Sequence, residues 1–260
     1  MVVGSKIITM KTAEDFAKME IAGVCVAATH TAIREAIAPG VKLTDLDAIA
    51  AEVIAEWGCR PSFLGYNGYP ATICASANSA IVHGIPSGHK LRGGDIISID
   101  VGAIYEGWHG DAAFTAPVGA VADEVATLLE ITEQALWNGI AAAHAGNRLG
   151  DIGHAVEATA TPHGYGVVRE YIGHGIGRQM HEAPNVPNYG KSGKGLKIKE
   201  GMALAIEPMF NLGTADTAVL DDDWTVVTAD GAWSAHFEHT VLLTDRGTVV
   251  STVPEPILVD

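Results

Sequence analysis

The chain has 260 residues, enough for one large domain or two small ones with a sizeable buried core. Hydrophobic residues make up 48% of the sequence and charged residues 18%, a balance that excludes general disorder. The net charge of −15 argues against a broad phosphate-binding face, so DNA is not an expected partner.

The cysteines and the N-terminal residues indicate a cytoplasmic protein. Cys25, Cys59 and Cys74 are odd in number and show no C-x-x-C spacing. This pattern fits a reducing compartment and disfavours a disulfide framework or a thiolate zinc site. Residues 1–11 lack the basic start and the apolar stretch of a secretory signal.

Two helices are predicted to open the fold. The first begins near Thr12, with Asp15 placed three residues later in a capping-box pattern, and stops before a Pro-Gly pair. The second begins at Thr44, again with an acid, Asp47, three residues later, and ends around Gly58.

Strands and two more helices are predicted in the rest of the chain. The charge-free run at residues 61–89 contains prolines and glycines, so it indicates turns and short buried strands and not a membrane span. Segments rich in β-branched and small residues indicate further strands. The predicted strands are residues 80–82, 96–101, 112–116, 202–206, 225–228, 240–243 and 248–253, and the helices are residues 123–145 and 151–161.

The two halves of the sequence repeat a pattern. His83-Gly-Ile-Pro resembles His174-Gly-Ile-Gly, and Asp100 and Glu207 each lie six residues after a glycine, at the end of an apolar strand. The pattern is short, so chance similarity is the alternative. A genuine repeat predicts two α+β halves that face each other across a cleft, with carboxylates from both at the junction. We therefore expect a single domain over all 260 residues.

Four carboxylates and one histidine are the strongest candidates for chemistry. Asp100 and Asp111 flank a Gly-rich turn, so a hairpin would place them on neighbouring strands. Glu207 and Glu238 adjoin apolar strands, where an unpaired acid is costly. His174 lies between glycines that let an imidazole project into a cleft. Taken singly, Asp100 and Asp111 have the alternative of a surface acid and a turn acid, and the histidine has the alternative of a satisfied core or surface group.

These five residues predict a site for two divalent metal ions. Four negative charges are too many for one divalent ion and nearly balance two. Oxygen ligands with one imidazole suit Mn²⁺, Fe²⁺ or Co²⁺ at least as well as Zn²⁺. Two ions about 3.5–4 Å apart activate a shared water as a nucleophile near neutral pH. The chemistry implied is hydrolysis.

Motifs for other chemistry are incomplete. Arg178 occupies the place of the last glycine in a dinucleotide-binding motif that begins at Gly173. Asn185 stands where a P-loop ending at Ser192 needs its first glycine. The same residue stands where a zincin motif beginning at His181 needs its second histidine.

At these residues the chain resembles the type I methionine aminopeptidases, whose fold is called pita-bread. The resemblance covers residues 13–252 and implies two pseudo-symmetric α+β halves around a central antiparallel sheet. The matching motifs are Leu64-Gly-Tyr66-Asn-Gly-Tyr69-Pro70, His83-Gly-Ile-Pro86, Ser98-Ile-Asp100, Trp108-His-Gly-Asp111, Gly173-His174-Gly-Ile-Gly177, Ile206-Glu207-Pro208 and Glu238-His-Thr240.

The resemblance implies a ligand set and a reaction. Residues matching Asp100, Asp111 and Glu238 hold one ion, and those matching Asp111, His174, Glu207 and Glu238 hold the other. The ions are cobalt, manganese, iron or zinc. The implied reaction removes the initiator methionine from nascent proteins and peptides, with a preference for a small second residue. A hydroxide that bridges the metals attacks the first peptide bond.

The resemblance also implies catalytic and substrate-binding residues. His83 and His181 flank the metals and contact the scissile peptide, and Glu207 is the candidate base. Both histidines have a cleft-lining role without catalysis as the alternative. A pocket with aromatic walls and sulfur atoms suits the thioether side chain of methionine. The alternative role for the residues of such a pocket is ordinary core packing. The implied methionine pocket consists of Phe63, Tyr66, Tyr69, Cys74, Met180 and Trp224.

Phe63 and Met180 depart from the family pattern, in which many relatives have a smaller residue and an aromatic residue respectively. Ser79 and Ala80 replace an acidic and a β-branched residue before His83. These departures concern the shape of the pocket and the rate, not the reaction type.

The expected partners are nascent polypeptide N-termini, and a monomer without a membrane partner is expected. A basic stretch is a candidate contact with ribosomal RNA, with a solvated loop as the alternative. Its basic residues are Lys191, Lys194, Lys197 and Lys199.

One rival function is that of a prolidase or X-Pro aminopeptidase, which generally carries an additional N-terminal domain, whereas here only a short extension at residues 1–10 is expected. The other rival is a non-enzymatic binding protein on the same fold. Such proteins typically lose metal ligands, whereas all five are present here.

Overall fold

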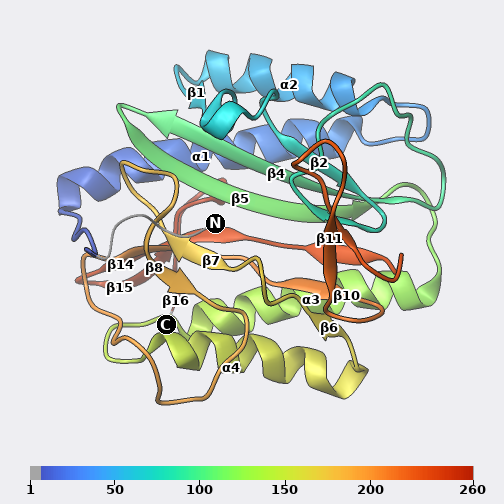
Figure 1. Ribbon diagram of the computed structural model, residues 1–260. Coiled ribbons are helices and arrows are strands. Elements are labelled where there is room, and N and C mark those ends of the chain that lie inside the picture. Colours follow the sequence, from blue (N-terminus) through green and yellow to red (C-terminus); the bar gives the residue numbers. More distant parts are fainter. Residues whose placement is uncertain (1–6, 260) are drawn as a thin grey trace.

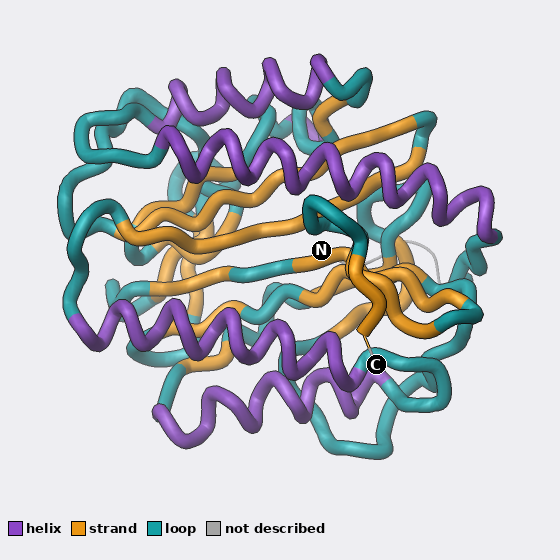
Figure 2. The backbone as a smooth tube through the Cα atoms, turned by 180° about the vertical axis from the view of Figure 1, so that it is seen from behind, coloured by secondary structure: helices purple, strands orange, loops and turns teal. Residues whose placement is uncertain are grey.

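Helices form the two outer layers of the structure. The computed structural model describes residues 7–259, so residue 260 and residues 1–6 of the predicted N-terminal extension lie outside it. The α-helices in the described part are α1 (Ala13–Ala36), α2 (Leu43–Glu56), α3 (Asp123–Ala142) and α4 (Leu149–Ala160). In Figures 1 and 2, α1 and α2 lie together on one side of the strands, and α3 and α4 on the other. The four predicted helices are confirmed.

The local sequence pattern predicts the start of the first helix correctly but not that of the second. The predicted capping box of α1 is confirmed, since the Asp15 N–H donates to Thr12 Oγ1 and the Thr12 N–H donates to the Asp15 carboxylate. The predicted start of α2 at Thr44 is wrong. That helix follows Lys42, whose N–H donates to the carboxylate of Asp45 at 3.1 Å.

Asp47 has a tertiary role instead of the predicted capping role. Its carboxylate accepts the N–H groups of Thr72 and Ile73 at 2.8 and 3.0 Å. These bonds tie α2 to the loop that precedes Cys74, and so fix one wall of the cavity described below.

The strands of the first half are antiparallel and include one long hairpin. Residues 61–89 form turns and short strands, as predicted, including a 3₁₀ turn at Tyr66–Gly68. β4 pairs with β1, β2 and β5, and every residue of β4 has a partner on β5. The strands are β1 (Arg60–Pro61), β2 (Cys74–Ala77), β3 (Ala80–Val82), β4 (Ile96–Tyr105) and β5 (Trp108–Pro117).

The second half contributes a six-stranded antiparallel sheet in the order β16-β15-β14-β9-β7-β8. Two smaller sheets, β13-β10-β6 and β11-β12-β3, lie beside it. The strands are β6 (Gly166–Val167), β7 (Gly173–Gly175), β8 (Glu182–Val186), β9 (Ala203–Ile206), β10 (Met209–Asn211), β11 (Thr217–Val219), β12 (Val226–Thr228), β13 (Ser234–His236), β14 (His239–Thr244), β15 (Gly247–Val250) and β16 (Ile257–Val259).

The two halves join where β5 meets the residue that precedes β14. Ala113 and Glu238 exchange two backbone hydrogen bonds with N···O distances of 3.3 and 2.8 Å. β3 also crosses between the halves to pair with β12. One buried apolar cluster includes Ile99 of the first half and Leu204 of the second. The predicted α+β architecture, with antiparallel strands at its centre, is confirmed.

Candidate active site

Two of the four candidate carboxylates come from the β4–β5 hairpin. Asp100 lies opposite Ala113, two residues from Asp111, so both acids project from the same face of the hairpin. The hairpin prediction is therefore confirmed. The expectation that Asp100 ends its strand is wrong, because β4 continues to Tyr105 and each of these residues pairs with β5.

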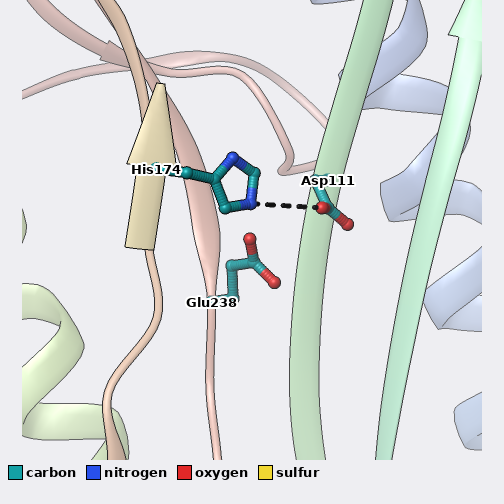
Figure 3. A group of neighbouring side chains, drawn as sticks. All are labelled: Asp111, His174 and Glu238. Carbon is teal, nitrogen blue, oxygen red and sulfur yellow. Dashed lines mark ion pairs between the residues drawn. The ribbon is translucent and has the colours of Figure 1, made fainter. Parts of the chain in front are cut away.

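The other candidate ligands come from the second half. His174 lies in the middle of β7, Glu207 directly follows β9, and Glu238 is the residue bridged to β5. His174 Nε2 lies 4.0 Å from Asp111 Oδ2 and 3.6 Å from Glu207 Oε1. Figure 3 shows the imidazole directed at Asp111, with the carboxylate of Glu238 beside both. One ligand atom from each of these three residues lies within 4.8 Å of the others.

The buried acids of this cluster lack ordinary partners. Asp111 and Glu238 are each 2% exposed. Asp100 Oδ1, Asp111 Oδ1 and Glu238 Oε1 are buried and have no hydrogen-bond donor among the described residues. A buried carboxylate oxygen without a donor is unfavourable unless a cation or a proton sits against it.

The donor set fits divalent cations. Four carboxylates and one imidazole supply hard oxygen ligands with a single nitrogen, which suits Mn²⁺, Fe²⁺, Co²⁺ or Zn²⁺. His174 Nδ1 lies 2.9 Å from the carbonyl oxygen of Gly175. A hydrogen at Nδ1 donated to that carbonyl leaves the lone pair of Nε2 facing the carboxylates, as metal-binding histidines require.

Burial raises the pKa of every carboxyl group in the cluster. The pKa of Asp100 rises to about 7, and that of Glu207 rises to about 8 with a further contribution from Asp100. Burial and the neighbouring carboxylates raise the pKa of Asp111 and of Glu238 well above the ordinary value. Without cations, the cluster therefore retains protons at neutral pH.

The raised pKa values predict a pH-dependent stability for the cation-free protein. Above a pH of about 6.5 the histidines of the unfolded chain are neutral, as the buried histidines of the folded protein are, so the raised carboxyl pKa values decide which state binds more protons. In that range the folded protein binds more protons than the unfolded chain, and its free energy of unfolding falls as the pH rises from about 7 to about 8. We expect the melting temperature of chelator-treated protein to fall from about pH 7 to about pH 8.5, and Mn²⁺ to raise it more at pH 8.5 than at pH 7. A melting temperature that rises over this range would contradict the assignment of these shifts.

All thirteen residues named as site candidates line one cavity of about 500 Å³ that opens to solvent. The carboxylates and His174 lie at one end. Phe63, Tyr69, Cys74 and Met180 form a buried cluster at the other, with the partly buried Tyr66 and Trp224 packed against it. Val82 and His236 also line the cavity and were not predicted. His236 lies two residues before Glu238, so the period-two spacing of an extended segment could have pointed to it.

Two further histidines lie between the carboxylates and the apolar part of the cavity. The rings of His181 and His174 have centroids 4.2 Å apart, and His181 Nδ1 lies 2.8 Å from Tyr66 Oη. His83 packs edge-on against Trp224 at 6.4 Å. Burial lowers the pKa of His83 to about 4 and that of His181 to about 2, so both rings are neutral at neutral pH.

A buried ion pair anchors the loop that carries Met180 and His181. Lys11 Nζ lies 2.9 Å from Glu182 Oε2, and the two side chains are 2% and 8% exposed. The same carboxylate accepts hydrogen bonds from Thr9 Oγ1 and the Gln179 N–H. Although burial raises the pKa of Glu182, these donors together lower it below the ordinary value.

Replacement of Glu182 with Gln is expected to destabilise the fold by about 3 kcal/mol, because it leaves the Lys11 ammonium buried without a counter-charge. The double variant Lys11→Met/Glu182→Gln is expected to recover part of this loss, because it removes that ammonium. Urea unfolding of the single and double variants measures both values. Equal stability of Glu182→Gln and the unmodified protein would show that the pair contributes nothing.

Comparison with known proteins gives the same assignment as the geometry. The sequence profile of metallopeptidase family M24 matches residues 17–245. The chain belongs to metallopeptidase family M24. Methionine aminopeptidase 1 of Mycobacterium tuberculosis is 51% identical over 257 residues, which cover 96% of this chain and 97% of that protein. Methionine aminopeptidase 1 of Bacillus subtilis is 48% identical over 240 residues, which cover 92% and 97% respectively.

Solved structures of family M24 proteins share the fold. The methionine aminopeptidase of Thermotoga maritima superposes with a TM-score of 0.93 at 41% identity, covering 95% of this chain and all of that one. The prolidase of Pyrococcus furiosus superposes with a TM-score of 0.77 at 24% identity, and the match covers 95% of this chain and 66% of the prolidase. The second likeness concerns the fold alone.

These findings confirm the resemblance to methionine aminopeptidases, the pita-bread fold and the class of enzyme, an aminopeptidase hydrolase of a metallopeptidase family. In residues 7–259, no helix is both long enough and apolar enough to cross a membrane.

Proposed function

We propose that this chain removes the N-terminal methionine from nascent proteins and peptides, with a preference for a small second residue. The observation that supports it most is one cavity that joins a buried carboxylate–histidine cluster to an apolar pocket with aromatic and sulfur-containing walls. The names of the relatives, methionine aminopeptidases, support the same reaction.

In this proposal the five candidate ligands hold two divalent ions. Asp111 and Glu238, which the family resemblance assigns to both ions, would serve both, and the backbone pairing of Glu238 with β5 brings them together. Asp100 completes one set of ligands, and His174 and Glu207 complete the other. Bound divalent ions polarise a carbonyl oxygen and lower the pKa of water, which is the chemistry that peptide hydrolysis requires.

The protein's own groups would orient the peptide and move the proton. Glu207 would accept a proton from the attacking water, since its carboxylate lies beside the cluster, with Oε1 3.6 Å from His174 Nε2. His181 donates a hydrogen bond from Nε2 to the carbonyl oxygen as negative charge develops there. The 2.8 Å contact of its Nδ1 with Tyr66 Oη fixes the ring. His83 contacts the scissile peptide from the opposite wall.

The apolar end of the cavity would bind the methionine side chain. Tyr69 packs edge-on against Trp224 at 5.0 Å and against Phe63 at 6.5 Å, which gives a rigid aromatic wall. Met180 and Cys74 add polarizable sulfur on the same surface. An unbranched thioether fits such a pocket without a hydrogen-bond partner.

Assays with two different substrates distinguish this function from that of a prolidase. Protein reconstituted with Mn²⁺ is given a Met-Gly-X tripeptide and, separately, an X-Pro dipeptide. Release of methionine from the tripeptide alone is the expected result. Cleavage of the dipeptide alone would replace the proposal with the prolidase function.

The basic stretch lies in a loop, and a ribosome contact there stays a prediction. All four of its lysines, Lys191, Lys194, Lys197 and Lys199, are exposed. We expect their joint replacement by Gln to reduce co-sedimentation with ribosomes, since contacts with RNA phosphates are electrostatic. Unchanged co-sedimentation would leave the solvated loop as the explanation.

We also place the protein in the cytoplasm, which its three buried free cysteines support.

A further inference from the structure

His236 is a buried histidine of the cavity to which the mechanism above gives no role. It ends β13 and is 1% exposed. Neither of its ring nitrogens has a hydrogen-bond partner among the described residues. Buried polar groups without partners are rare and costly, so an imidazole in this state needs an explanation.

The backbone of His236 is held rigidly against the strand that carries Asp111. Its N–H donates to Thr115 Oγ1 at 2.9 Å, and its carbonyl oxygen lies 2.8 Å from the same hydroxyl. Thr115 Oγ1 lies 2.8 Å from Ser98 Oγ on β4. On its other side, His236 pairs with Met209 of β10. The position of the ring is therefore set by two sheets and not by a mobile loop.

The ring is aimed at two candidate metal ligands. His236 Nε2 lies 3.8 Å from Glu207 Oε2 and 3.9 Å from Glu238 Oε2. The other oxygen of Glu207, Oε1, lies 3.6 Å from His174 Nε2. The Glu207 carboxylate thus lies between two imidazoles, and each of its oxygens faces a different one.

We propose that His236 is a positioning residue for the divalent-cation site. With its hydrogen at Nε2, the ring donates to the oxygens of Glu207 and Glu238 and orients both carboxylates toward the cations. The separations of 3.8 and 3.9 Å are too long for hydrogen bonds in the cation-free state, so small shifts of the carboxylates on cation binding must close them. This inference rests on the proposed two-cation function and adds a residue that sets its affinity.

Donation to the carboxylates explains the surroundings of His236 better than direct ligation of a cation does. A metal-binding histidine nearly always donates its other ring N–H to a nearby acceptor. His174 has such an acceptor in the Gly175 carbonyl oxygen at 2.9 Å. His236 Nδ1 has none among the described residues. Its ring is therefore placed to orient ligands and not to be one.

Cation titration of three His236 variants tests the proposal. Leu and Phe cannot donate a hydrogen bond, whereas Gln carries an N–H donor of similar reach. We expect His236→Leu and His236→Phe to raise the Kd for Mn²⁺ by about 10–100-fold, the usual cost of losing a group that orients metal ligands. His236→Gln is expected to stay within about threefold of the unmodified protein. Isothermal titration calorimetry on chelator-treated protein gives the Kd directly, and circular dichroism establishes that each variant is folded.

His30 supplies a matched control. It is a buried imidazole whose Nε2 also lacks a partner among the described residues, but it packs on Phe114 and does not line the cavity. His30→Leu is expected to leave the Kd for Mn²⁺ unchanged.

Two results would overturn the inference. One is an unchanged Kd for Mn²⁺ in both His236→Leu and His236→Phe. The other is a His236→Gln variant that binds as weakly as these two. Either result, in a protein that cleaves the Met-Gly-X tripeptide, removes the inference and leaves the proposed function standing. Tight Mn²⁺ binding that depends on His236, in a protein that cleaves no Met-Gly-X tripeptide, removes the proposed function instead.

Discussion

Replacement of Asp111 with Asn is expected to abolish peptide hydrolysis, with a fall in kcat/KM of about 10³-fold or more. Asp111 is assigned to both cations, so its loss weakens both ligand sets. Bound metals contribute several kcal/mol of transition-state stabilisation, and each 1.4 kcal/mol or so corresponds to a factor of about ten in rate. The metal content of the purified variant, measured by mass spectrometry, is expected to fall in parallel with its activity.

The same replacement is expected to stabilise the cation-free protein at pH 8. Burial and the neighbouring acids Asp100 and Glu207 raise the pKa of Asp111, so its ionised form opposes folding. An amide of the same shape carries no such charge. Asp95→Asn is the control, since Asp95 accepts hydrogen bonds from Asn78 and the Arg92 N–H and does not line the cavity. Full activity and full metal content in Asp111→Asn would contradict the ligand assignment.

Replacement of His181 with Ala is expected to lower kcat by about 10²–10³-fold, the usual effect of removing one donor to a developing oxyanion. Metal content is expected to remain unchanged, because His181 is not among the proposed ligands. Steady-state hydrolysis of Met-Gly-X, with metal analysis of the same samples, separates these two quantities.

Replacement of Tyr66 with Phe tests whether the orientation of the His181 ring affects kcat. It removes the hydroxyl that lies 2.8 Å from His181 Nδ1 while keeping the ring in the pocket. We expect a fall in kcat of about 10-fold, smaller than for loss of the imidazole, since only the orientation of the ring is weakened. An unchanged rate in His181→Ala would remove this residue from the mechanism.

Local sequence patterns located the helices but not every helix end. Thr12 and Asp15 cap α1 as predicted, because the interaction involves only residues close together in the chain. Thr44 and Asp47 show the same spacing, yet Asp47 bonds to the backbone at Thr72 and Ile73 instead. The local sequence pattern does not predict a tertiary contact of this kind.

The candidate site was accessible from sequence for a physical reason. Acids such as Glu207 and Glu238 adjoin apolar strands, and an acid in such a place needs a cation or a proton. The meeting of the two halves depends on the backbone pairing of Ala113 with Glu238, which no local pattern encodes. His236 was missed because a single histidine beside an apolar segment usually has an ordinary core role. Its unpartnered nitrogens become evident only in three dimensions.

The most direct test of the central claim is hydrolysis of a Met-Gly-X tripeptide by chelator-treated protein after reconstitution with Mn²⁺, Fe²⁺, Co²⁺ or Zn²⁺. No methionine release is expected without added metal. Release is expected to reach its maximum at about two equivalents of an active ion, because four carboxylates balance two divalent charges. Failure of all four ions to restore methionine release would contradict the assignment of this cavity as a two-metal aminopeptidase site.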